Sequence, residues 1–255
     1  MFLLCLQRLL YARLLLYGIC AMISLWYYSR RVALARKTDA NRRGGAKNGA
    51  RMYRSFWKRI FDLVLSGLAI LVLSPLLLLL CLWIKLDSKG PVLFRQKRIG
   101  IRRSTFEIMK FRTMRIDTPH DVPTHLLKDP DQWITRAGRI LRKTSLDELP
   151  QLFQIFSGKM AIVGPRPALW NQDDLVEARE RYGANDVRPG LTGWAQVNGR
   201  DVLSIEDKAK LDGEYAAHVT FGMDVKCLWK TVVAVLTGKG IVEGEQAGGN
   251  KTENE

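Results

Sequence analysis

The chain has 255 residues, enough for one catalytic domain with attachments to bury a substantial core. Its 40 Lys and Arg residues outnumber its 25 Asp and Glu residues, and the formal net charge of +15 indicates an anionic partner, such as phospholipid headgroups, a phosphorylated substrate or nucleic acid. The cysteines and histidines are scattered without metal-ligand spacing, which argues against a zinc site.

The first predicted elements are an apolar segment and a linker. We expect residues 1–35 to associate with a membrane, although their uncharged part, residues 14–28, is shorter than the ~20 residues that a spanning helix needs. A signal peptide is the competing interpretation, but no small-residue cleavage site precedes the arginines. Residues 36–51 are polar, basic and rich in glycine, which is typical of a linker.

A second apolar run, residues 63–84, is long enough to span a bilayer. Two features argue against a simple crossing. Ser74-Pro75 lies at its midpoint, where proline removes a backbone donor and bends a helix. Basic residues flank both ends, which disfavours moving either end across the membrane. We therefore predict a re-entrant helix over 52–88 that bends at Ser74-Pro75 and returns to the cytoplasmic face; an ordinary kinked span is the alternative.

The pattern becomes globular over residues 89–242, for which we predict an α+β, mostly helical domain. Two strands over 92–100 and 104–114 form a small β-hairpin by their spacing. Helices are expected over 134–142, 148–157, 171–183, 205–219 and 224–240, with Asn171 capping the third and Gly183 ending it. The last helix is rich in Trp and Val and suits either a membrane surface or the core. Residues 243–255 are polar and are predicted to be disordered.

Two adjacent carboxylates, Asp147 and Glu148, precede the predicted helix over 148–157. Ser145 and Glu148 have capping-box spacing, and acidic residues favour the first turn of a helix, so a purely structural role explains the pair as well. Pro150 does not suit that register. A helix N-terminus also binds phosphate and keeps a carboxylate ionised, as a nucleophile or a metal ligand must be. Both interpretations remain open at this level.

Several cations surround this acidic pair in the sequence. Arg166 stands between Pro165 and Pro167, which fix the backbone on both sides and limit the entropy that the side chain loses on binding a phosphate. Lys110 and Arg112 are two residues apart in the second predicted strand, so they could point to one face. Arg142 precedes the pair. Each cation taken alone is more often a solvated surface charge, and the grouping is what favours a phosphate site.

Residues 188–200 are rich in Gly, Pro and Asn and are predicted to form a loop. Arg188 and Gly193 belong to a stretch that suits a backbone nest for an anion, with Trp194 as an aromatic platform. This motif is weak when it stands alone. The sequence contains no Walker A, GxGxxG or GxSxG pattern, which excludes the commonest nucleotide-binding and serine-hydrolase motifs.

Taken in order, four motifs resemble those of the bacterial sugar transferases, the monotopic polyprenyl-phosphate phosphoglycosyl transferases. The resemblance covers residues 52–240 and rests on RSFWKRIFDLVLSGLAILVLSPLLLL, KFRTM, TSLDELPQLFQIFSGKMAIVGPRP and RPGLTGWAQVNGR. It implies the compact form of that family, in which a sugar-1-phosphate passes from a UDP-sugar to a polyprenyl (undecaprenyl) phosphate and UMP is released. Such a reaction is the first membrane step of a surface glycan, on the cytoplasmic face of the bacterial inner membrane.

The resemblance also implies roles for individual residues. Asp147 would be the nucleophile that forms a covalent phosphosugar intermediate, and Glu148 would bind or orient Mg²⁺. Arg166 would hold a phosphate, and the further substrate-binding residues would be Lys110, Arg112, Arg142, Pro165, Pro167, Arg188 and Gly193. Ser74-Pro75 would bend the re-entrant helix. Expected partners are an anionic phospholipid membrane, a second copy of the chain as a homodimer and downstream glycosyltransferases.

Two alternatives compete with this interpretation. A membrane-anchored basic adaptor for anionic lipid or nucleic acid explains the net charge but gives Asp147 and Glu148 no role. We expect no nucleic acid as partner, because the Arg and Lys clusters lack the interleaved aromatic residues of single-strand binders. The other alternative is a phosphatase or hydrolase that acts on a lipid-linked diphosphate.

Overall fold

The computed structural model describes residues 52–118, 130–199 and 202–237. The predicted segments 1–35, 36–51 and 243–255 lie outside the described residues. The α-helices of the described residues, in chain order, are α3 (Lys58–Asp87), α4 (Arg136–Lys143), α5 (Gln151–Phe156), α6 (Asp173–Arg181), α7 (Trp194–Val197), α8 (Ile205–Ala217) and α9 (Phe221–Thr237). The strands are β1 (Leu93–Ile99), β2 (Thr105–Phe111), β3 (Ala161–Val163) and β4 (Gly190–Thr192). The predicted α+β, mostly helical fold is confirmed at this level.

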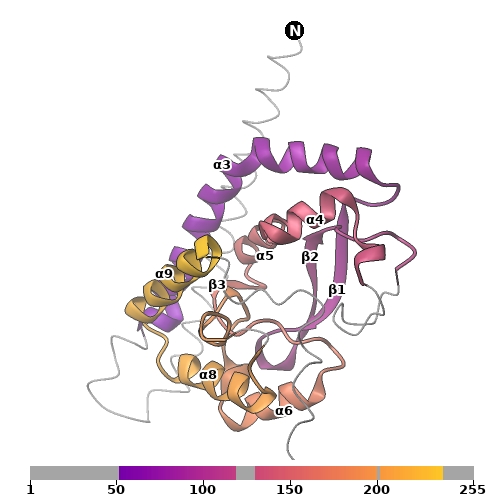
Figure 1. The fold of residues 1–255 in the computed structure, drawn as a ribbon. Helices are drawn as coiled ribbons and strands as arrows, with labels where there is room; N and C mark the ends of the chain where they lie inside the picture. The colour runs from indigo at the N-terminus through magenta and orange to yellow at the C-terminus, as the bar shows by residue number, and fades with distance from the viewer. Residues whose placement is uncertain (1–51, 119–129, 200–201, 238–255) are drawn as a thin grey trace, which may run out of the picture.

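Two small sheets organise the domain. Strands β1 and β2 pair in an antiparallel register that runs from Leu93 opposite Phe111 to Ile99 opposite Thr105, so the predicted hairpin is confirmed. Strands β3 and β4 pair in parallel, with Ala161 opposite Gly190. The sequence does not predict this second sheet. Its two short strands are separated by α6 and pair only through tertiary contact (Figure 1).

Helix α3 is the longest element and contains Pro75. Together with the turn before it, the segment Tyr53–Asp87 is long and apolar enough to cross a membrane, judged by length and composition. Figure 1 shows that α3 changes direction partway along, as expected where proline removes a backbone donor. The side of α3 away from the domain carries exposed aliphatic residues, namely Val64, Leu65, Leu68, Leu71, Val72, Leu78, Leu79, Leu82 and Leu86.

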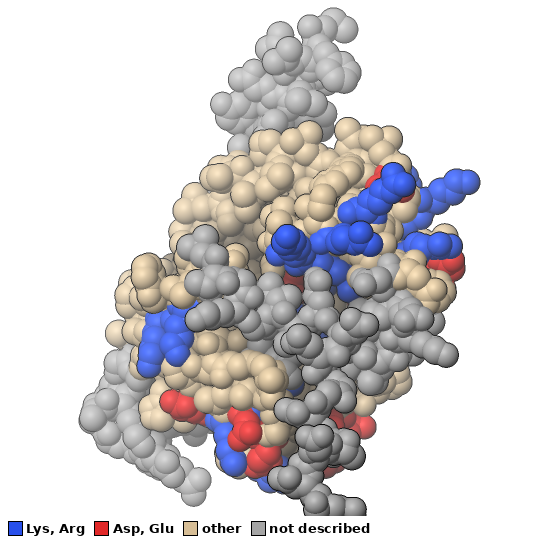
Figure 2. All heavy atoms as spheres, in the orientation of Figure 1, with Lys and Arg blue, Asp and Glu red and all other residues tan. Residues whose placement is uncertain are grey.

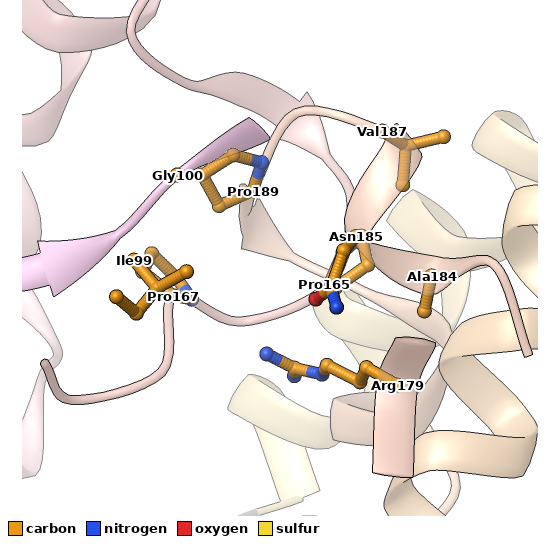
Figure 3. A pocket seen from close by; sticks show the side chains of 9 residues that line it. All are labelled: Ile99, Gly100, Pro165, Pro167, Arg179, Ala184, Asn185, Val187 and Pro189. Atoms are coloured by element: carbon orange, nitrogen blue, oxygen red, sulfur yellow. The ribbon is translucent and has the colours of Figure 1, made fainter. Parts of the chain in front are cut away.

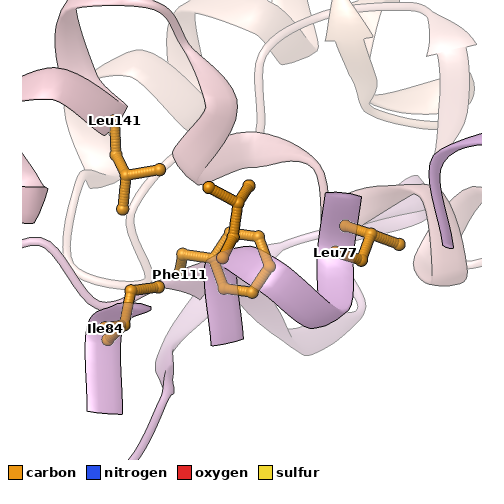
Figure 4. Close-up of a cluster of buried hydrophobic side chains, with 5 residues drawn as sticks. Leu77, Ile84, Phe111 and Leu141 are labelled. Atoms are coloured by element: carbon orange, nitrogen blue, oxygen red, sulfur yellow. The ribbon is translucent and has the colours of Figure 1, made fainter. Parts of the chain in front are cut away.

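The second half of α3 packs on the hairpin and on α4. Leu77, Leu80 and Ile84 form one buried cluster with Phe111 at the end of β2 and Leu141 of α4 (Figure 4). A neighbouring cluster joins β2 to α5 and to the residue before β3, and its members are Ile108, Leu152, Ile155 and Met160. Burial of this apolar surface holds the segment between α4 and α5 against the end of β2.

A buried polar network ties the start of α3 to the rest of the domain. Asp224 of α9 accepts hydrogen bonds from Tyr53 at 2.7 Å, from Lys58 at 2.7 Å and from Tyr215 at 2.6 Å. Asp62 accepts a hydrogen bond from the N–H of Ile162, in β3, at 3.0 Å. Buried polar groups satisfied in this way fix the orientation of α3 relative to α8, α9 and β3.

Several predicted boundaries need correction. The helix expected over 148–157 begins only at Gln151, after a separate 3₁₀ turn, Leu146–Glu148. The helix expected over 171–183 begins at Asp173, and its N-cap position is Gln172 rather than Asn171. Gly183 does lie just after that helix, with a positive φ of 66°. The loop expected over 188–200 is wrong in large part, because it holds strand β4 and the short helix α7.

Candidate active site

Asp147 and Glu148 lie in the 3₁₀ turn between α4 and α5. The turn follows Ser145, whose backbone takes the left-handed conformation with φ at 56°. The Ser145 side chain makes no capping hydrogen bond, and the Glu148 N–H donates to the Ser145 carbonyl oxygen at 3.3 Å. The capping-box alternative is therefore wrong, because the pair sits in a separate tight turn rather than at the start of a long helix.

Glu148 is held by two cations from distant parts of the chain. Lys110, near the end of β2, donates from Nζ to Glu148 Oε1 at 2.6 Å, and Arg166 donates from Nη2 to the same oxygen at 3.1 Å. Burial by itself raises the pKa of this carboxyl, but attraction to Lys110 and Arg166 outweighs burial, so the pKa of Glu148 lies well below its usual range. Glu148 therefore stays ionised, and its position is fixed.

Asp147 has a different environment from its neighbour. Its Oδ2 lies 3.8 Å from Lys110 Nζ, beyond hydrogen-bonding distance. Burial raises the pKa of Asp147; Lys110 and Arg142 lower it, while the charge of Glu148 adds to the rise. The two adjacent carboxylates thus differ, because one is locked by cations while the other is desolvated without a short hydrogen bond to a described residue.

The turn around Arg166 is positioned by backbone contacts on both sides. Gly164 N–H donates to the Thr192 carbonyl oxygen at 2.8 Å, and Gly190 N–H donates to the Pro165 carbonyl oxygen at 2.9 Å. On the other side of Arg166, the Pro167 carbonyl oxygen accepts a hydrogen bond from Arg98 at 3.1 Å. Pro165 and Pro167 are buried, while Arg166 reaches the dyad. The β3–β4 sheet thus presents this arginine to Glu148.

Arg188 and Gly193 do not form the expected anion nest. Gly193 packs so closely on Gly164 that a Cβ atom would lie 2.1 Å from the Gly164 carbonyl oxygen. Arg188 Nε donates to the Gly158 carbonyl oxygen at 3.0 Å. Trp194 is buried under Lys226 and Lys230 and donates to Glu214 at 2.9 Å, so it presents no open platform. The glycines of this segment admit a neighbouring backbone rather than a ligand.

Of the two predicted arginines Arg112 and Arg142, the structure brings only Arg142 near the dyad. Arg112 is buried and donates to the carbonyl oxygens of Ser88 and Lys89, after the end of α3, so the structure does not bring it to the dyad. The expectation of a shared face with Lys110 is wrong, because β2 ends at Phe111 and the alternation of side chains ends with it. Arg142 donates to Thr113 Oγ1 at 2.9 Å and lies close enough to Asp147 to lower the pKa of that carboxyl.

Sequence reasoning missed two polar residues, Arg98 and Gln151, that line the cavity beside Glu148. This cavity, of about 10 Å³, is bounded by Arg98, Ile108, Lys110, Glu148, Gln151, Arg166 and Pro167. Burial and the nearby Arg166 lower the pKa of Arg98 to about 10, against the effect of Glu148. Gln151 follows Glu148 by three positions, and nothing else in its local sequence distinguishes it from an ordinary helix residue. Arg98 carried no signal either, since it is one of several cations in β1.

The charge on the surface is unevenly distributed. Figure 2 shows Lys and Arg side chains gathered over the region of α4, with Asp and Glu side chains gathered on the same view over the region of α6 and α8. A cationic region near the dyad attracts an anionic substrate and holds it.

A second cavity, of about 10 Å³, lies on another side of the Arg166 turn (Figure 3). Its lining includes Pro165, Pro167 and Arg179. Arg179 is buried and donates two hydrogen bonds to Asp212, at 2.6 and 2.9 Å, so the carboxylate neutralises the buried guanidinium. A space of this size holds about one water molecule, and the one charged residue in its lining is already paired with Asp212, so we assign this cavity no ligand.

Comparison with known proteins decides the family. The family model described as "Bacterial sugar transferase" matches residues 53–238, which include the re-entrant candidate, the dyad and the Arg166 turn. The chain belongs to the bacterial sugar transferase family. The predicted resemblance is confirmed, and all four motifs on which it rested lie within or overlap the matched residues.

Relatives within the family have named activities. The chain is 43% identical over 189 residues to the UDP-glucose:undecaprenyl-phosphate glucose-1-phosphate transferase of Caulobacter vibrioides, covering 71% of this chain and 70% of the relative. It is 42% identical to the undecaprenyl-phosphate glucose phosphotransferase of Komagataeibacter xylinus, covering 69% of this chain and 35% of that protein. It is 36% identical to the UDP-N-acetylgalactosamine-undecaprenyl-phosphate N-acetylgalactosaminephosphotransferase of Aeromonas hydrophila, covering 73% of this chain and 45% of that protein. The chain thus spans from about a third to about seven tenths of these relatives' lengths.

Proposed function

We propose that this chain transfers a sugar-1-phosphate from a UDP-sugar to polyprenyl phosphate and releases UMP. The observation that carries the proposal is the contrast within the dyad, where Glu148 is locked by Lys110 and Arg166 while Asp147 makes no short hydrogen bond to a described residue. Family membership and the printed names of the relatives support these substrate classes. A basic adaptor has no evident use for two carboxylates kept in such different environments. A hydrolase could use them, and the printed names of the relatives are what favour transfer over hydrolysis.

In the proposed first step, an oxygen of the Asp147 carboxylate attacks the β-phosphorus of the UDP-sugar. A new phosphorus–oxygen bond forms to Asp147, the bond from that phosphorus to the bridging oxygen breaks, and UMP leaves with the bonding electrons. In the second step, an oxygen of polyprenyl phosphate attacks the same phosphorus and the Asp147 carboxylate is released. A covalent intermediate lets a soluble donor and a lipid acceptor use one site in turn.

The cations around the dyad have a defined task in this scheme. A diphosphate repels an attacking carboxylate, so its negative charge must be neutralised before the oxygen of Asp147 can approach. Arg166 presents a planar guanidinium from a rigid turn, and Lys110 stands between Glu148 and Asp147. Donors fixed in advance stabilise charge on the phosphoryl oxygens without reorganising at the moment of reaction.

The carboxylates of the dyad also fit Mg²⁺, which typically binds through one or two carboxylates, water and substrate phosphates. Within the described ranges no group of three or more His, Cys, Asp or Glu residues gathers, so an all-protein metal cage is absent there. We propose Glu148 as the ligand, with Asp147 beside it. When bound, the ion would neutralise charge on the diphosphate. Glu148 keeps the needed charge, because its pKa lies well below its usual range.

We place this reaction at the cytoplasmic face of a bacterial inner membrane, where a lipid-linked sugar phosphate begins a surface glycan. The exposed aliphatic side of α3 supports insertion, and the bend of that helix together with basic residues at both ends favours re-entry over spanning. Helix α9 also exposes apolar residues, namely Phe221, Val225, Trp229, Val232, Val233 and Val235, as a helix at the membrane surface does. Basic residues near anionic lipid would add about 1 kcal/mol each.

The proposed function is tested by measuring UMP release across a panel of UDP-sugars. The purified full-length chain is assayed with polyprenyl phosphate and Mg²⁺, and Asp147→Asn is the matched control. We expect release with one sugar or a small set, and none from the variant. Release of inorganic phosphate from a lipid-linked diphosphate, with no UMP from any sugar, would favour the hydrolase alternative. UMP release by Asp147→Asn at the wild-type rate would refute the assignment of the nucleophile.

A further inference from the structure

Gln151, the first residue of α5, carries a buried donor that no acceptor satisfies. The side chain is 2% exposed, and its Nε2 group donates to no acceptor among the described residues. Buried amide groups are nearly always paired, since an unmade hydrogen bond leaves the full cost of desolvation. A native protein that keeps such a group at the edge of its active site has a reason to do so.

Gln154, one helical turn later, shows what a purely structural glutamine looks like in this fold. It is equally buried, and its Oε1 accepts from the Met109 N–H at 2.9 Å while its Nε2 donates to the Glu107 carbonyl oxygen. Both ends of this amide thus bond to β2 and join α5 to the hairpin. Gln151 sits on the same helix but has no such acceptor for its Nε2.

Gln151, which carries this donor, is one of the residues that line the cavity beside Glu148. Arg98 lines the same cavity, and its buried Nε also has no acceptor among the described residues. Lys110 and Arg166 also line the cavity, so residues with N–H donors outnumber the one carboxylate there. At about 10 Å³ the space takes roughly one water-sized group, which is the size of a single phosphoryl oxygen.

We propose that Gln151 Nε2 and Arg98 Nε donate hydrogen bonds to a non-bridging oxygen of the phosphoryl group that is transferred. This inference rests on the proposed function. Gln151 is a neutral donor, so it can stabilise the phosphoryl oxygen without withdrawing charge from the neighbouring Glu148. A donor fixed by α5 requires no rearrangement when the bond to Asp147 forms, and it acts on the transition state more than on the bound substrate.

The test compares Gln151→Met with the matched variant Gln154→Met in the full-length protein. Both changes replace a buried amide by an apolar chain of similar length. For Gln151→Met we expect UMP release in a single turnover to slow by about 10- to 100-fold, the loss of one hydrogen bond to a charged group, with KM for the UDP-sugar nearly unchanged. Its Tm should equal or exceed that of wild type, because an unsatisfied donor is removed. Gln154→Met should instead lower the Tm, because it breaks two hydrogen bonds to β2.

A second variant, Gln151→Glu, keeps the shape of the side chain. It keeps the proposal testable if Gln151→Met fails to fold. At neutral pH it places a negative charge where a donor stood, so its rate relative to wild type should fall further. The ratio of the Gln151→Glu rate to the wild-type rate should rise again as the pH is lowered, because the glutamic acid then gains a proton that it can donate. A ratio that does not change with pH would indicate a structural role only.

The outcomes separate the two claims. If the wild-type protein releases UMP and Gln151→Met does so at the same single-turnover rate, the role of Gln151 is overturned and the proposed function stays intact. A wild-type protein that releases no UMP from any UDP-sugar overturns the transfer reaction and this role with it. A slower Gln151→Met whose Tm falls as far as that of Gln154→Met assigns the effect to folding and also overturns the inference.

Discussion

The unequal environments of the dyad predict opposite effects on stability for two conservative substitutions. Glu148→Gln removes the charge that Lys110 and Arg166 bind. The Lys110 and Glu148 side chains are only 19% and 15% exposed, so a hydrogen bond between charged groups at this site contributes about 1.5–3 kcal/mol. Arg166 is 39% exposed, and solvent screening limits its share to roughly 0.5 kcal/mol. We therefore expect a loss of about 2–3 kcal/mol, or roughly 5–10 °C in Tm for a domain of this size.

Asp147→Asn should act in the other direction. The pKa of Asp147 is raised in the folded state, so the folded protein binds this proton more tightly than the unfolded chain does. The ionised carboxylate consequently destabilises the fold at neutral pH, and that penalty is relieved as the pH falls through the folded-state pKa. For Glu148 the sign is reversed: its stabilisation is complete above the unfolded-state pKa, and it is lost as the pH falls toward the folded-state pKa. Asp147→Asn should thus raise the Tm while abolishing transfer.

Thermal unfolding of the detergent-solubilised protein at neutral pH checks both predictions. Glu107→Gln is the matched control, because its pairing with Arg95 is long at 3.9 Å and both side chains are more than half exposed. We expect this control to leave the Tm unchanged. The reasoning is refuted if Asp147→Asn lowers the Tm as much as Glu148→Gln does, or if Glu148→Gln behaves like the control.

Further predictions concern the supports of the site. Arg112→Leu should lower the Tm by leaving two carbonyl oxygens unpaired after α3, yet KM for the UDP-sugar should stay at the wild-type value in steady-state assays. Gly193→Ala should prevent correct folding, seen as rapid proteolysis, because its Cβ would lie 2.1 Å from the Gly164 carbonyl oxygen. The rate of UMP release should fall at acidic pH with a midpoint above the ~3.9 of an ordinary aspartate, since the pKa of Asp147 is raised. Pro75→Ala should straighten α3 and move its C-terminal flank toward the opposite side of the membrane, as cysteine labelling would report.

The parts of this fold that sequence alone predicts depend on local patterns. The β1–β2 hairpin follows from two strand-like runs joined by a short Gly-containing connection, and α4 follows from its spacing of apolar residues. The grouping of Lys110 and Arg166 with Glu148 was also predictable in outline. It follows from cations placed on either side of an acidic pair. The distances by which Lys110 and Arg166 hold Glu148 rather than Asp147 were not predictable from the sequence.

The rest depends on tertiary contact that no local pattern carries. The glycines of residues 188–200 predict a loop because they suggest freedom of the backbone. The segment instead contains strand β4, and Gly193, just after that strand, is needed for close packing on Gly164. Arg112 was placed with Lys110 by strand alternation, but its partners come from the end of α3. Gln151 looks like an ordinary helix residue in the sequence. Its unpaired donor becomes visible only when α5, β1 and the Arg166 turn are seen around one cavity.

The central claim is that Asp147 carries the sugar phosphate between donor and acceptor. It is tested most directly by mixing the protein with its UDP-sugar and Mg²⁺ in the absence of polyprenyl phosphate, and then measuring the mass of the intact protein and of its peptides. We predict a sugar-phosphate adduct on the peptide that contains Asp147, equal in amount to the UMP released, lost when polyprenyl phosphate is added and absent from Asp147→Asn. UMP release without an adduct, or an adduct that persists in Asp147→Asn, would contradict the account.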